Sequence, residues 1–164
     1  MAFFPGVGLV HYRAAKLDPK KKGEAHLKLW IEHLLLQITG WEGPKQSYLI
    51  GEDGTWQFQP VANAADLLQA LLDLYFKGLA TPLPFFPKSS FAYAIGPGPR
   101  TTKSAEDLAW EAWEGDPDDE FGQGDLEDPY FNLCFRNHPD PLGAEFQELA
   151  SAVVGPLLDS QKEL

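Results

Sequence analysis

The order of hydrophobic patterns between residues 7 and 79 constrains the fold more than any other feature of the sequence. Residues 7–17 begin with alternating apolar side chains and predict a β-strand. Apolar residues then recur every three or four positions over 24–39, which predicts an amphipathic helix. An Asp-Gly pair separates two short apolar runs, 47–51 and 55–61, and predicts a β-hairpin.

A second helix follows the hairpin. Asn63 and Asp66 are typical of a helix start, and the apolar pattern continues to Leu79. Because this helix has more apolar side chains than one stripe needs, we expect it to be buried on two sides. The order strand, helix, hairpin, helix predicts an α/β (α+β) fold with a small mixed sheet flanked by helices. The 164 residues are expected to form one domain over 1–158 and a polar, frayed tail over 159–164.

The second half of the chain gives weaker structural signals. Three prolines within 82–87 exclude a helix or a central strand there, and the phenylalanines between them predict a packed, extended loop. Residues 91–95 fit a short strand or a helix. A third helix is predicted over 104–113 from its capping pattern. We expect a strand over 130–135 and a last helix that begins at Asp140-Pro141 and ends near Gly155-Pro156.

The charge of the chain is strongly negative and unevenly distributed. Thirteen Lys and Arg face 24 Asp and Glu, a formal net charge of −11, which argues against a free-standing nucleic-acid-binding protein. Residues 1–45 nevertheless have more basic than acidic side chains, so a phosphate-facing surface is expected there; the alternative is a solvated, lysine-rich turn. The acidic stretch 106–129 has no Lys or Arg and is expected to be a solvated loop or a docking surface for a basic partner.

The sequence lacks the common catalytic and metal-binding motifs. The sequence has no phosphate-cradling glycine loop, no HExxH and no CxxC. His26 and His33 lie seven positions apart on one predicted helix without ligands at metal spacing, so no zinc site and no cofactor are expected. Cys134, the one cysteine, lies in an apolar run and is expected to be a buried structural thiol in a reducing, cytoplasmic setting. No apolar stretch approaches the length of a membrane span.

A metal-dependent nuclease needs at least two carboxylates that converge on a hard cation. One recurrent arrangement is Asp/Glu-x-Lys on a strand, and its literal match here is Asp18-Pro19-Lys20. This match lies where the predicted strand ends and has proline at its centre, so a stable ligand geometry is not expected. An active nuclease would have to combine carboxylates that are distant in the sequence, such as Asp18, Glu24, Asp53 or Asp66.

Several segments resemble the C-terminal region of RecC, the gamma subunit of the bacterial exodeoxyribonuclease V, or RecBCD helicase–nuclease. The longest runs from LLDLYFKGL at 71–79 into PLPFFPKSSFAYA at 82–94. Shorter matches lie at 30–34, 128–136 and 140–150, so the resemblance covers nearly the whole chain. It implies the terminal domain of a much larger subunit.

The resemblance also implies a PD-(D/E)XK nuclease fold with a degenerate active site. Active relatives have Asp-Tyr-Lys on a strand and Gln-Leu-x-Leu-Tyr on a helix, where this chain has His-Tyr-Arg at 11–13 and His-Leu-Lys-Leu-Trp at 26–30. His11, Arg13 and His26 would then be the degenerate nuclease positions, and magnesium would not bind there. The alternative is that His11 and Arg13 are the outward positions of an alternating strand.

The function implied by this resemblance is that of a non-catalytic domain in double-strand break repair and recombination. It would dock to RecB-like and RecD-like subunits and guide a DNA strand within the complex, although the chain alone should bind DNA weakly or undetectably. Candidate contacts to the DNA backbone are Arg13, Lys16, Lys20, Lys21 and Lys22, and the candidate docking loop contains Pro84, Phe85, Phe86 and Lys88. Internal packing is the alternative for that loop. The alternative functions are an active magnesium-dependent nuclease and a protein-binding module without a DNA role.

Overall fold

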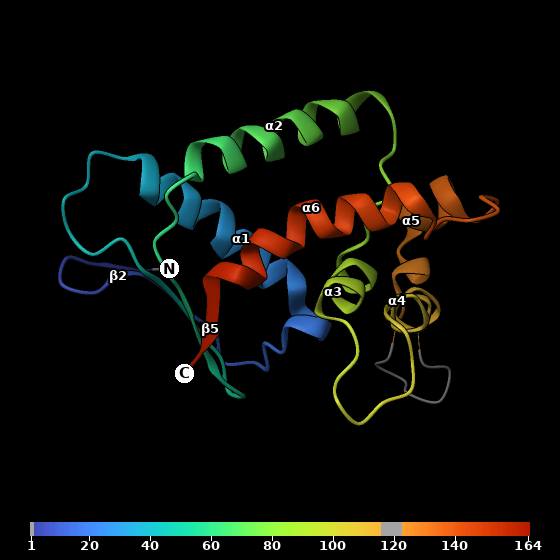
Figure 1. Ribbon diagram of the computed structural model, residues 1–164, viewed down its shortest axis with the longest axis horizontal. Helices are drawn as coiled ribbons and strands as arrows, with labels where there is room; N and C mark the ends of the chain where they lie inside the picture. Colours follow the sequence, from blue (N-terminus) through green and yellow to red (C-terminus); the bar gives the residue numbers. More distant parts are fainter. Residues whose placement is uncertain (1, 116–122) are drawn as a thin grey trace. The chain divides into compact units, whose positions relative to one another are not determined.

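The computed structural model describes residues 2–115 and 123–164. The contacts between residues in space divide the chain into two compact units, whose segments can be followed by their residue colours in Figure 1. Unit 1 comprises Met1–Ala80 and Pro156–Leu164, and unit 2 comprises Thr81–Gly155. Among the described helices, none combines the length and the hydropathy that a membrane span requires.

Unit 1 contains a five-stranded mixed sheet. Its strands are β1 (Ala2–Phe4), β2 (Gly8–Tyr12), β3 (Ser47–Ile50), β4 (Thr55–Phe58) and β5 (Gln161–Glu163), and they are adjacent in that order. Strands β2 and β3 are parallel, whereas every other neighbouring pair is antiparallel. The sequence-based prediction of a small mixed sheet and of the β3–β4 hairpin is therefore confirmed.

The ends of the sheet differ from the sequence-based expectation. Strand β1 has no counterpart in the prediction, and β2 ends at Tyr12, earlier than the predicted strand over 7–17. The expectation of a frayed tail is wrong, because Gln161 pairs with Phe58 and Lys162 with Gln57 at the sheet edge. Backbone pairing with β4 orders these residues even though their side chains are polar.

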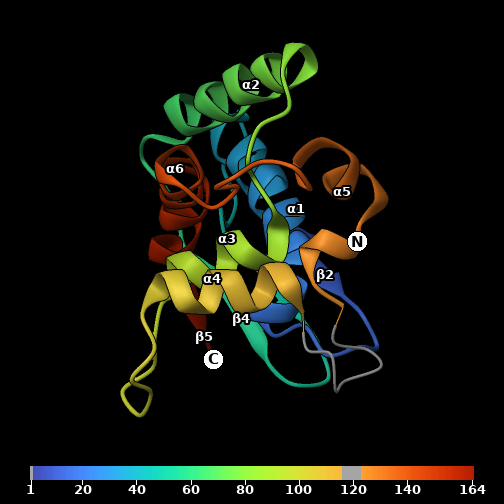
Figure 2. The ribbon, with the colours of Figure 1, turned by 90° about the vertical axis from the view of Figure 1, so that its right-hand side faces the viewer.

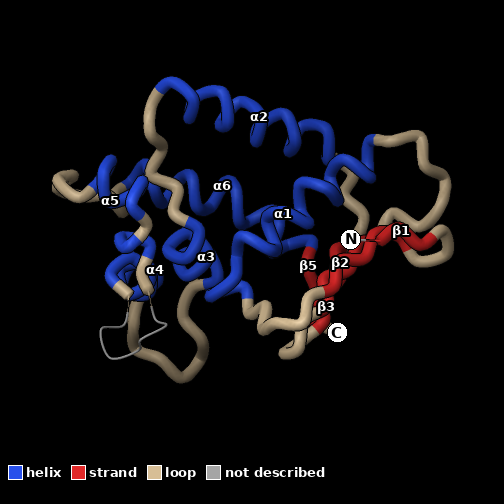
Figure 3. Tube along the Cα trace, turned by 180° about the vertical axis from the view of Figure 1, so that it is seen from behind, coloured by secondary structure: helices blue, strands red, loops and turns tan. Residues whose placement is uncertain are grey.

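Helix α1 (Pro19–Ile38) packs on one face of the sheet (Figure 3). It begins earlier than predicted, because the Asp18 carboxylate accepts a hydrogen bond from the Lys20 backbone N–H and Pro19 occupies the first turn. Its first turn is separated from the rest by a kink at Lys22, where φ is −133°. The ring of Trp30 stacks on Phe58 of β4 with a centroid distance of 6.1 Å, so this helix supplies one wall of the unit 1 core.

The two faces of the sheet have different environments. Buried and more exposed residues alternate along β3 and β4, which is the pattern of a sheet covered on one side. We call the buried side, which contacts α1, the inner face; it carries Leu9, His11, Ser47, Leu49, Trp56 and Phe58. The opposite side, the outer face, has Val10 as a buried residue. Its more exposed residues are Ala2, Phe4, Tyr12, Tyr48, Ile50, Thr55, Gln57 and Lys162.

Helix α2 (Ala64–Ala80) packs against α1 but is not buried on two sides, contrary to the sequence-based expectation. Ala64 is its one residue classed as buried, and a stripe of large apolar side chains faces solvent. This stripe, which we call the α2 stripe, consists of Leu72, Tyr75, Phe76 and Leu79. The hydrophobic content of this segment predicted the helix correctly. It does not determine how much of the helix surface is covered by other parts of the same chain.

Unit 2 is mainly helical. Helices α3 (Pro87–Ile95) and α4 (Ala105–Glu114) lie side by side (Figure 2), followed by a short 3₁₀ turn (Asp125–Glu127) and α5 (Pro129–Phe135). Helix α6 (Ala144–Ser160) starts in unit 2 and continues into the segment that belongs to unit 1. The core of unit 2 is built around Phe86, which contacts the rings of Trp113, Phe131, Phe135 and Phe146.

Several predictions for unit 2 are wrong. The expected strand over 130–135 is helix α5, because Asp128 caps its first turn and Pro129 occupies the first helical position. Cys134 on this helix is exposed, not buried. Helix α6 begins at Ala144, after the predicted Asp140-Pro141 start, and passes through Pro156, which costs one backbone hydrogen bond but does not end the helix.

The acidic stretch is also more ordered than a solvated loop. Its first part forms α4, and Asp125 is buried, where it accepts hydrogen bonds from the backbone N–H and the hydroxyl of Ser89 at the start of α3. Burial raises the pKa of Asp125, although the bonds from Ser89 and the Lys88 charge oppose this shift. The acidic residues at 116–122 lie outside the described part of the chain.

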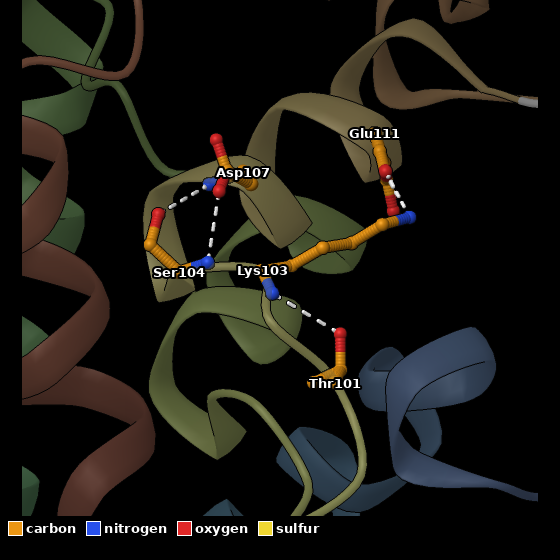
Figure 4. A network of polar contacts seen from close by, with 5 residues as sticks. All are labelled: Thr101, Lys103, Ser104, Asp107 and Glu111. Carbon is orange, nitrogen blue, oxygen red and sulfur yellow. Dashed lines mark hydrogen bonds and ion pairs between the residues drawn. The ribbon is translucent and has the colours of Figure 1, made fainter.

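The predicted start of α4 is confirmed by a capping box (Figure 4). The Ser104 hydroxyl accepts from the Asp107 N–H at 3.1 Å, and the Asp107 carboxylate accepts from the Ser104 N–H at 2.8 Å. The bond from the Ser104 N–H to the carboxylate is the main reason why the pKa of Asp107 is lowered, and the Ser104 side chain and the Lys103 charge act in the same direction. On the same helix, Glu111 forms an ion pair with Lys103.

Replacing Ser104 with alanine is expected to reduce the free energy of unfolding by about 1 kcal/mol, because the backbone N–H of Asp107 in the first turn of α4 loses its acceptor. Urea denaturation followed by far-UV circular dichroism measures this change. The matched control is Ser151→Ala, an exposed serine in the interior of α6, for which we expect no loss. Equal stability of the two variants would contradict a capping role for Ser104.

Candidate functional site

The first candidate position, His11, lies on the inner face of β2 and contacts helix α1. Its Nε2 atom is 2.6 Å from Oε2 of Glu32. Both atoms are buried and lie within ion-pair distance of one another, and neither forms a hydrogen bond among the described residues. The side chain therefore does not point outward from the strand. It is held between sheet and helix by a single carboxylate.

This arrangement differs from a magnesium site in its ligand chemistry. Magnesium prefers oxygen ligands, and a nuclease centre brings at least two carboxylates to the ion. Here an imidazole pairs with the nearby carboxylate of Glu32. Within residues 2–115 and 123–164, no three His, Cys, Asp or Glu side chains come together as a metal-binding group. The residues present at His11 thus do not fit a magnesium-binding nuclease centre.

Downstream of β2, a loop leads to α1 and is tied to the β3–β4 turn by Asp53. The Asp53 carboxylate accepts hydrogen bonds from the Leu17 N–H at 2.6 Å and from the Asp18 N–H at 3.0 Å. The bond from Leu17 is the main reason why the pKa of Asp53 is lowered, and the positive charge of Lys16 contributes as well. This carboxylate therefore fixes the path of the chain at Leu17 and Asp18, where the loop enters α1.

The candidate DNA contacts all lie on this tied segment. The Arg13 backbone N–H donates to the Ile50 carbonyl at 3.0 Å, which keeps the chain beside β3 after the strand ends. Arg13, Lys16 and the lysines at 20–22 are exposed. The structure therefore brings the five candidates onto one continuous loop and helix start with an ordered backbone.

The carboxylates considered for an active nuclease do not form one cluster. Asp18 and Asp53 are close, but both accept backbone N–H groups, Asp18 as the α1 cap and Asp53 as the loop tie. Glu24 lies on α1, and Asp66 lies in the first turn of α2. Their sequence positions alone could not have revealed that two of the four have structural partners.

Two buried histidines form polar links that the sequence did not predict. His33 Nε2 donates to the Gln59 carbonyl, and Nδ1 accepts from the Ser47 hydroxyl, each at 2.9 Å; the carbonyl can only accept, which assigns the tautomer. Burial lowers the pKa of His33 to about 4, although the Gln59 carbonyl acts in the opposite direction. The imidazole is therefore neutral at pH 7.

His26, the third degenerate position, joins three segments of unit 1. Its Nε2 donates to the Leu17 carbonyl at 2.7 Å, and its Nδ1 lies 2.6 Å from Oε1 of Gln161 on β5. The ring also contacts Trp56 edge-on. The structure thus places His26 in a buried structural link, and its seven-residue separation from His33 on one helix face was the available sequence signal.

The candidate docking loop in unit 2 requires a correction. Phe86 is 0% exposed and Pro84 is buried, so neither offers a side chain to a partner. Phe85 is half-buried, and the Lys88 ammonium donates to the Gln123 carbonyl. The loop packs internally because its phenylalanine fills the aromatic core of unit 2, which is the alternative given for it from the sequence.

Comparison with known proteins agrees with the resemblance seen in the sequence. Residues 4–96 match the RecC C-terminal domain, and this range contains β2–β4 and α1–α3. The Escherichia coli (strain K12) protein named RecBCD enzyme subunit RecC is 32% identical over 88 residues. This match covers 52% of the chain but 7% of the E. coli subunit. The chain therefore belongs to the RecC C-terminal domain family.

Proposed function

We propose that this chain is a non-catalytic, RecC-type domain of a DNA helicase–nuclease complex of the exodeoxyribonuclease V kind, acting in double-strand break repair and recombination. The mixed sheet with α1 would be a PD-(D/E)XK core that has lost its metal site. Its tasks would be to dock to RecB-like and RecD-like subunits and to guide a DNA strand.

The observation that carries this proposal is the pairing of His11 with Glu32. His11 stands at the position that the family resemblance assigns to a metal-binding carboxylate, and its contact with Glu32 is 2.6 Å long. Strand β2 and helix α1 form a packed scaffold around this pair, since Leu9 and Leu49 beside it are buried. This supports a scaffold whose shape serves a purpose other than hydrolysis.

Strand guidance is supported by the tied basic segment. Arginine and lysine side chains bind phosphate without a metal, and an ordered backbone lowers the entropy lost on binding. Arg13, Lys16 and the lysines at 20–22 are exposed on such a segment. The high negative charge of the chain predicts that this contact is weak unless other subunits hold the DNA.

Docking is supported by the α2 stripe. It exposes Tyr75 and Phe76 by 61% and 65%, and it lies within the residues that match the RecC C-terminal domain. A comparable apolar pair on α5, Tyr130 and Leu133, is also exposed but lies outside the matched residues. We therefore assign the docking role to the α2 stripe in place of the loop at 84–88.

The nuclease test uses linear DNA with Mg²⁺ or Mn²⁺ and the purified chain. We expect no cleavage above the buffer control, because Glu32 contacts His11 and Asp18 and Asp53 accept backbone N–H groups. Glu24 and Asp66 lie on two different helices. Reproducible cleavage that disappears in the Asp18→Ala variant would overturn the non-catalytic role. It would favour an active magnesium-dependent nuclease instead.

The docking test measures capture of the chain by an immobilised RecB-type subunit. The double variant Tyr75→Ser/Phe76→Ser is expected to reduce capture by at least about tenfold, because interface aromatic residues commonly contribute 1–2 kcal/mol or more each. The matched control, Tyr130→Ser/Leu133→Ser, should be captured like the unmodified chain. Equal capture of both double variants would remove the α2 stripe from the interface, and the absence of any capture would contradict docking to this subunit.

A further inference from the structure

The outer face of the sheet has an unusual composition for a chain of charge −11. Within the five described strands, the one acidic residue is Glu163, and it pairs with Trp56 of the inner face. The outer face instead presents tyrosines, a glutamine and an exposed lysine, Lys162. It is therefore a locally non-acidic surface in an acidic protein.

Two aromatic rings lie on neighbouring parallel strands of this face. Tyr12 is paired in register with Ile50, and Tyr48 is paired with Val10, so the two tyrosines are diagonal neighbours. Diagonal neighbours on adjacent strands are about 7–8 Å apart, so one bound ligand can contact both side chains. Tyr12 is 71% exposed, which is the highest value among the large apolar and aromatic side chains of the sheet.

The second ring is held in place by hydrogen bonds across the strands. Gln57 Nε2 donates to the Tyr48 hydroxyl at 2.9 Å, and this hydroxyl donates to Gln46 Oε1 at 3.0 Å. A ring whose orientation is fixed in the free protein loses less entropy when a ligand stacks on it. Both hydrogen bonds use the Tyr48 hydroxyl. The part of Tyr48 that remains for contact with a ligand is therefore its ring.

Positive charge adjoins these rings at the sheet edge. Arg13 follows Tyr12, but its N–H donates to the Ile50 carbonyl as the Leu9 N–H does to the Gln46 carbonyl, so Arg13 continues the inner-face register and does not belong to the outer face. Lys162 lies on β5, beside Gln57 on the same face. Aromatic rings flanked by cationic groups are the elements with which proteins bind single-stranded nucleic acid, since bases stack on the rings and phosphates pair with the cations.

We propose that the outer face is a stacking surface for single-stranded DNA, on which Tyr12 and Tyr48 contact successive bases while Lys162 contacts a phosphate. This inference rests on the strand-guidance part of the proposed function and specifies where the strand lies. The exposed basic side chains of the segment leading to α1, Arg13 among them, would hold phosphates beyond the end of β2.

The test is a fluorescence-anisotropy titration of the full 164-residue chain with labelled oligo(dT) of about 12 nucleotides, at about 20 mM NaCl. We expect weak binding that Tyr12→Ala reduces about tenfold, because one base loses its stacking partner. Tyr12→Phe should retain the affinity, since the ring remains. The matched control Tyr75→Ala removes a tyrosine of similar exposure on α2 and should leave binding unchanged.

A charge variant separates this inference from the function on which it rests. Joint replacement of Lys20, Lys21 and Lys22 by alanine should weaken binding and reduce its salt dependence. If this variant binds less but Tyr12→Ala binds like the unmodified chain, the stacking surface is wrong and strand guidance stands. If the unmodified chain does not bind oligo(dT) even at this low salt, the stacking surface is overturned, whereas strand guidance within the complex stands and capture by the RecB-type subunit would still support docking.

A protein partner on the same face is the competing explanation, and sedimentation velocity distinguishes it. If the unmodified chain is a dimer that Tyr12→Ala converts to a monomer, the outer face is a self-association surface and the proposal is overturned. Urea unfolding of Tyr12→Ala checks that the exposed substitution leaves the fold intact. A stable, monomeric Tyr12→Ala protein with reduced oligo(dT) binding is the expected result.

Discussion

Replacement of Phe86 by alanine should lower the free energy of unfolding by about 3–5 kcal/mol, the largest effect that we expect from a single substitution in unit 2. The side chain is fully buried, and its ring centroid lies 4.4 Å from that of Trp113 and 5.0 Å from that of Phe135. Truncation removes these contacts and leaves a cavity, because the surrounding rings cannot all move inward.

Urea denaturation followed by near-UV circular dichroism measures this loss, since Trp113 reports on the same core. The matched control is Phe76→Ala, the same change at a position that is 65% exposed on α2, and we expect a change within about 0.5 kcal/mol there. Similar destabilisation by both variants would mean that Phe86 does not anchor the unit 2 core. It would then again be a candidate for contact with a partner.

The second large effect concerns the pH dependence of unit 1. His33 has a pKa of about 4 in the folded state, whereas an unfolded histidine titrates near 6.5. The unfolded state therefore binds more protons between these values, so the stabilising contribution of neutral His33 is complete above pH 6.5 and is lost as the pH falls toward 4. We expect a loss of about 2 kcal/mol by pH 5 and about 3 kcal/mol by pH 4.

Urea unfolding curves at several pH values test this expectation, with His33→Gln as the comparison. The glutamine amide retains a donor for the Gln59 carbonyl but does not titrate, so its stability should fall less between pH 7 and 5. Asp125 acts in the opposite direction, because its raised pKa favours proton binding by the folded state. Its contribution is the same in both proteins, so parallel curves would show that His33 is not buried in its neutral form.

Local sequence signals were reliable where the structure depends on neighbouring residues. The Asp-Gly turn between β3 and β4, the period of α1 and the capping box at Ser104 are all contained within short windows. The wrong strand over 130–135 shows the limit of this reasoning. Its aromatic residues favour a strand, but the cap from Asp128 and the proline after it favour a helix, and the cap prevails.

The candidate site was predictable as a list of residues but not as an arrangement. His11 and the basic residues up to Lys22 could be selected from the sequence and the family resemblance. Their partners could not, because Glu32 lies 21 positions from His11, and Asp53 lies 36 and 35 positions from the two N–H groups whose hydrogen bonds it accepts. The roles of these two acids follow from distance and burial, which no sequence window contains.

By itself, the sequence determined the central elements of unit 1 from β2 to α2, the mixed α/β class and the membership in the RecC C-terminal domain family, because periodicity, caps and motif identity are properties of adjacent residues. Only the tertiary structure decided that His11 is paired with Glu32, that Phe86 is core and that α2 leaves an apolar stripe exposed. Pairing and burial depend on which distant segments approach one another, and an apolar side chain has the same letter whether its neighbours cover it or not.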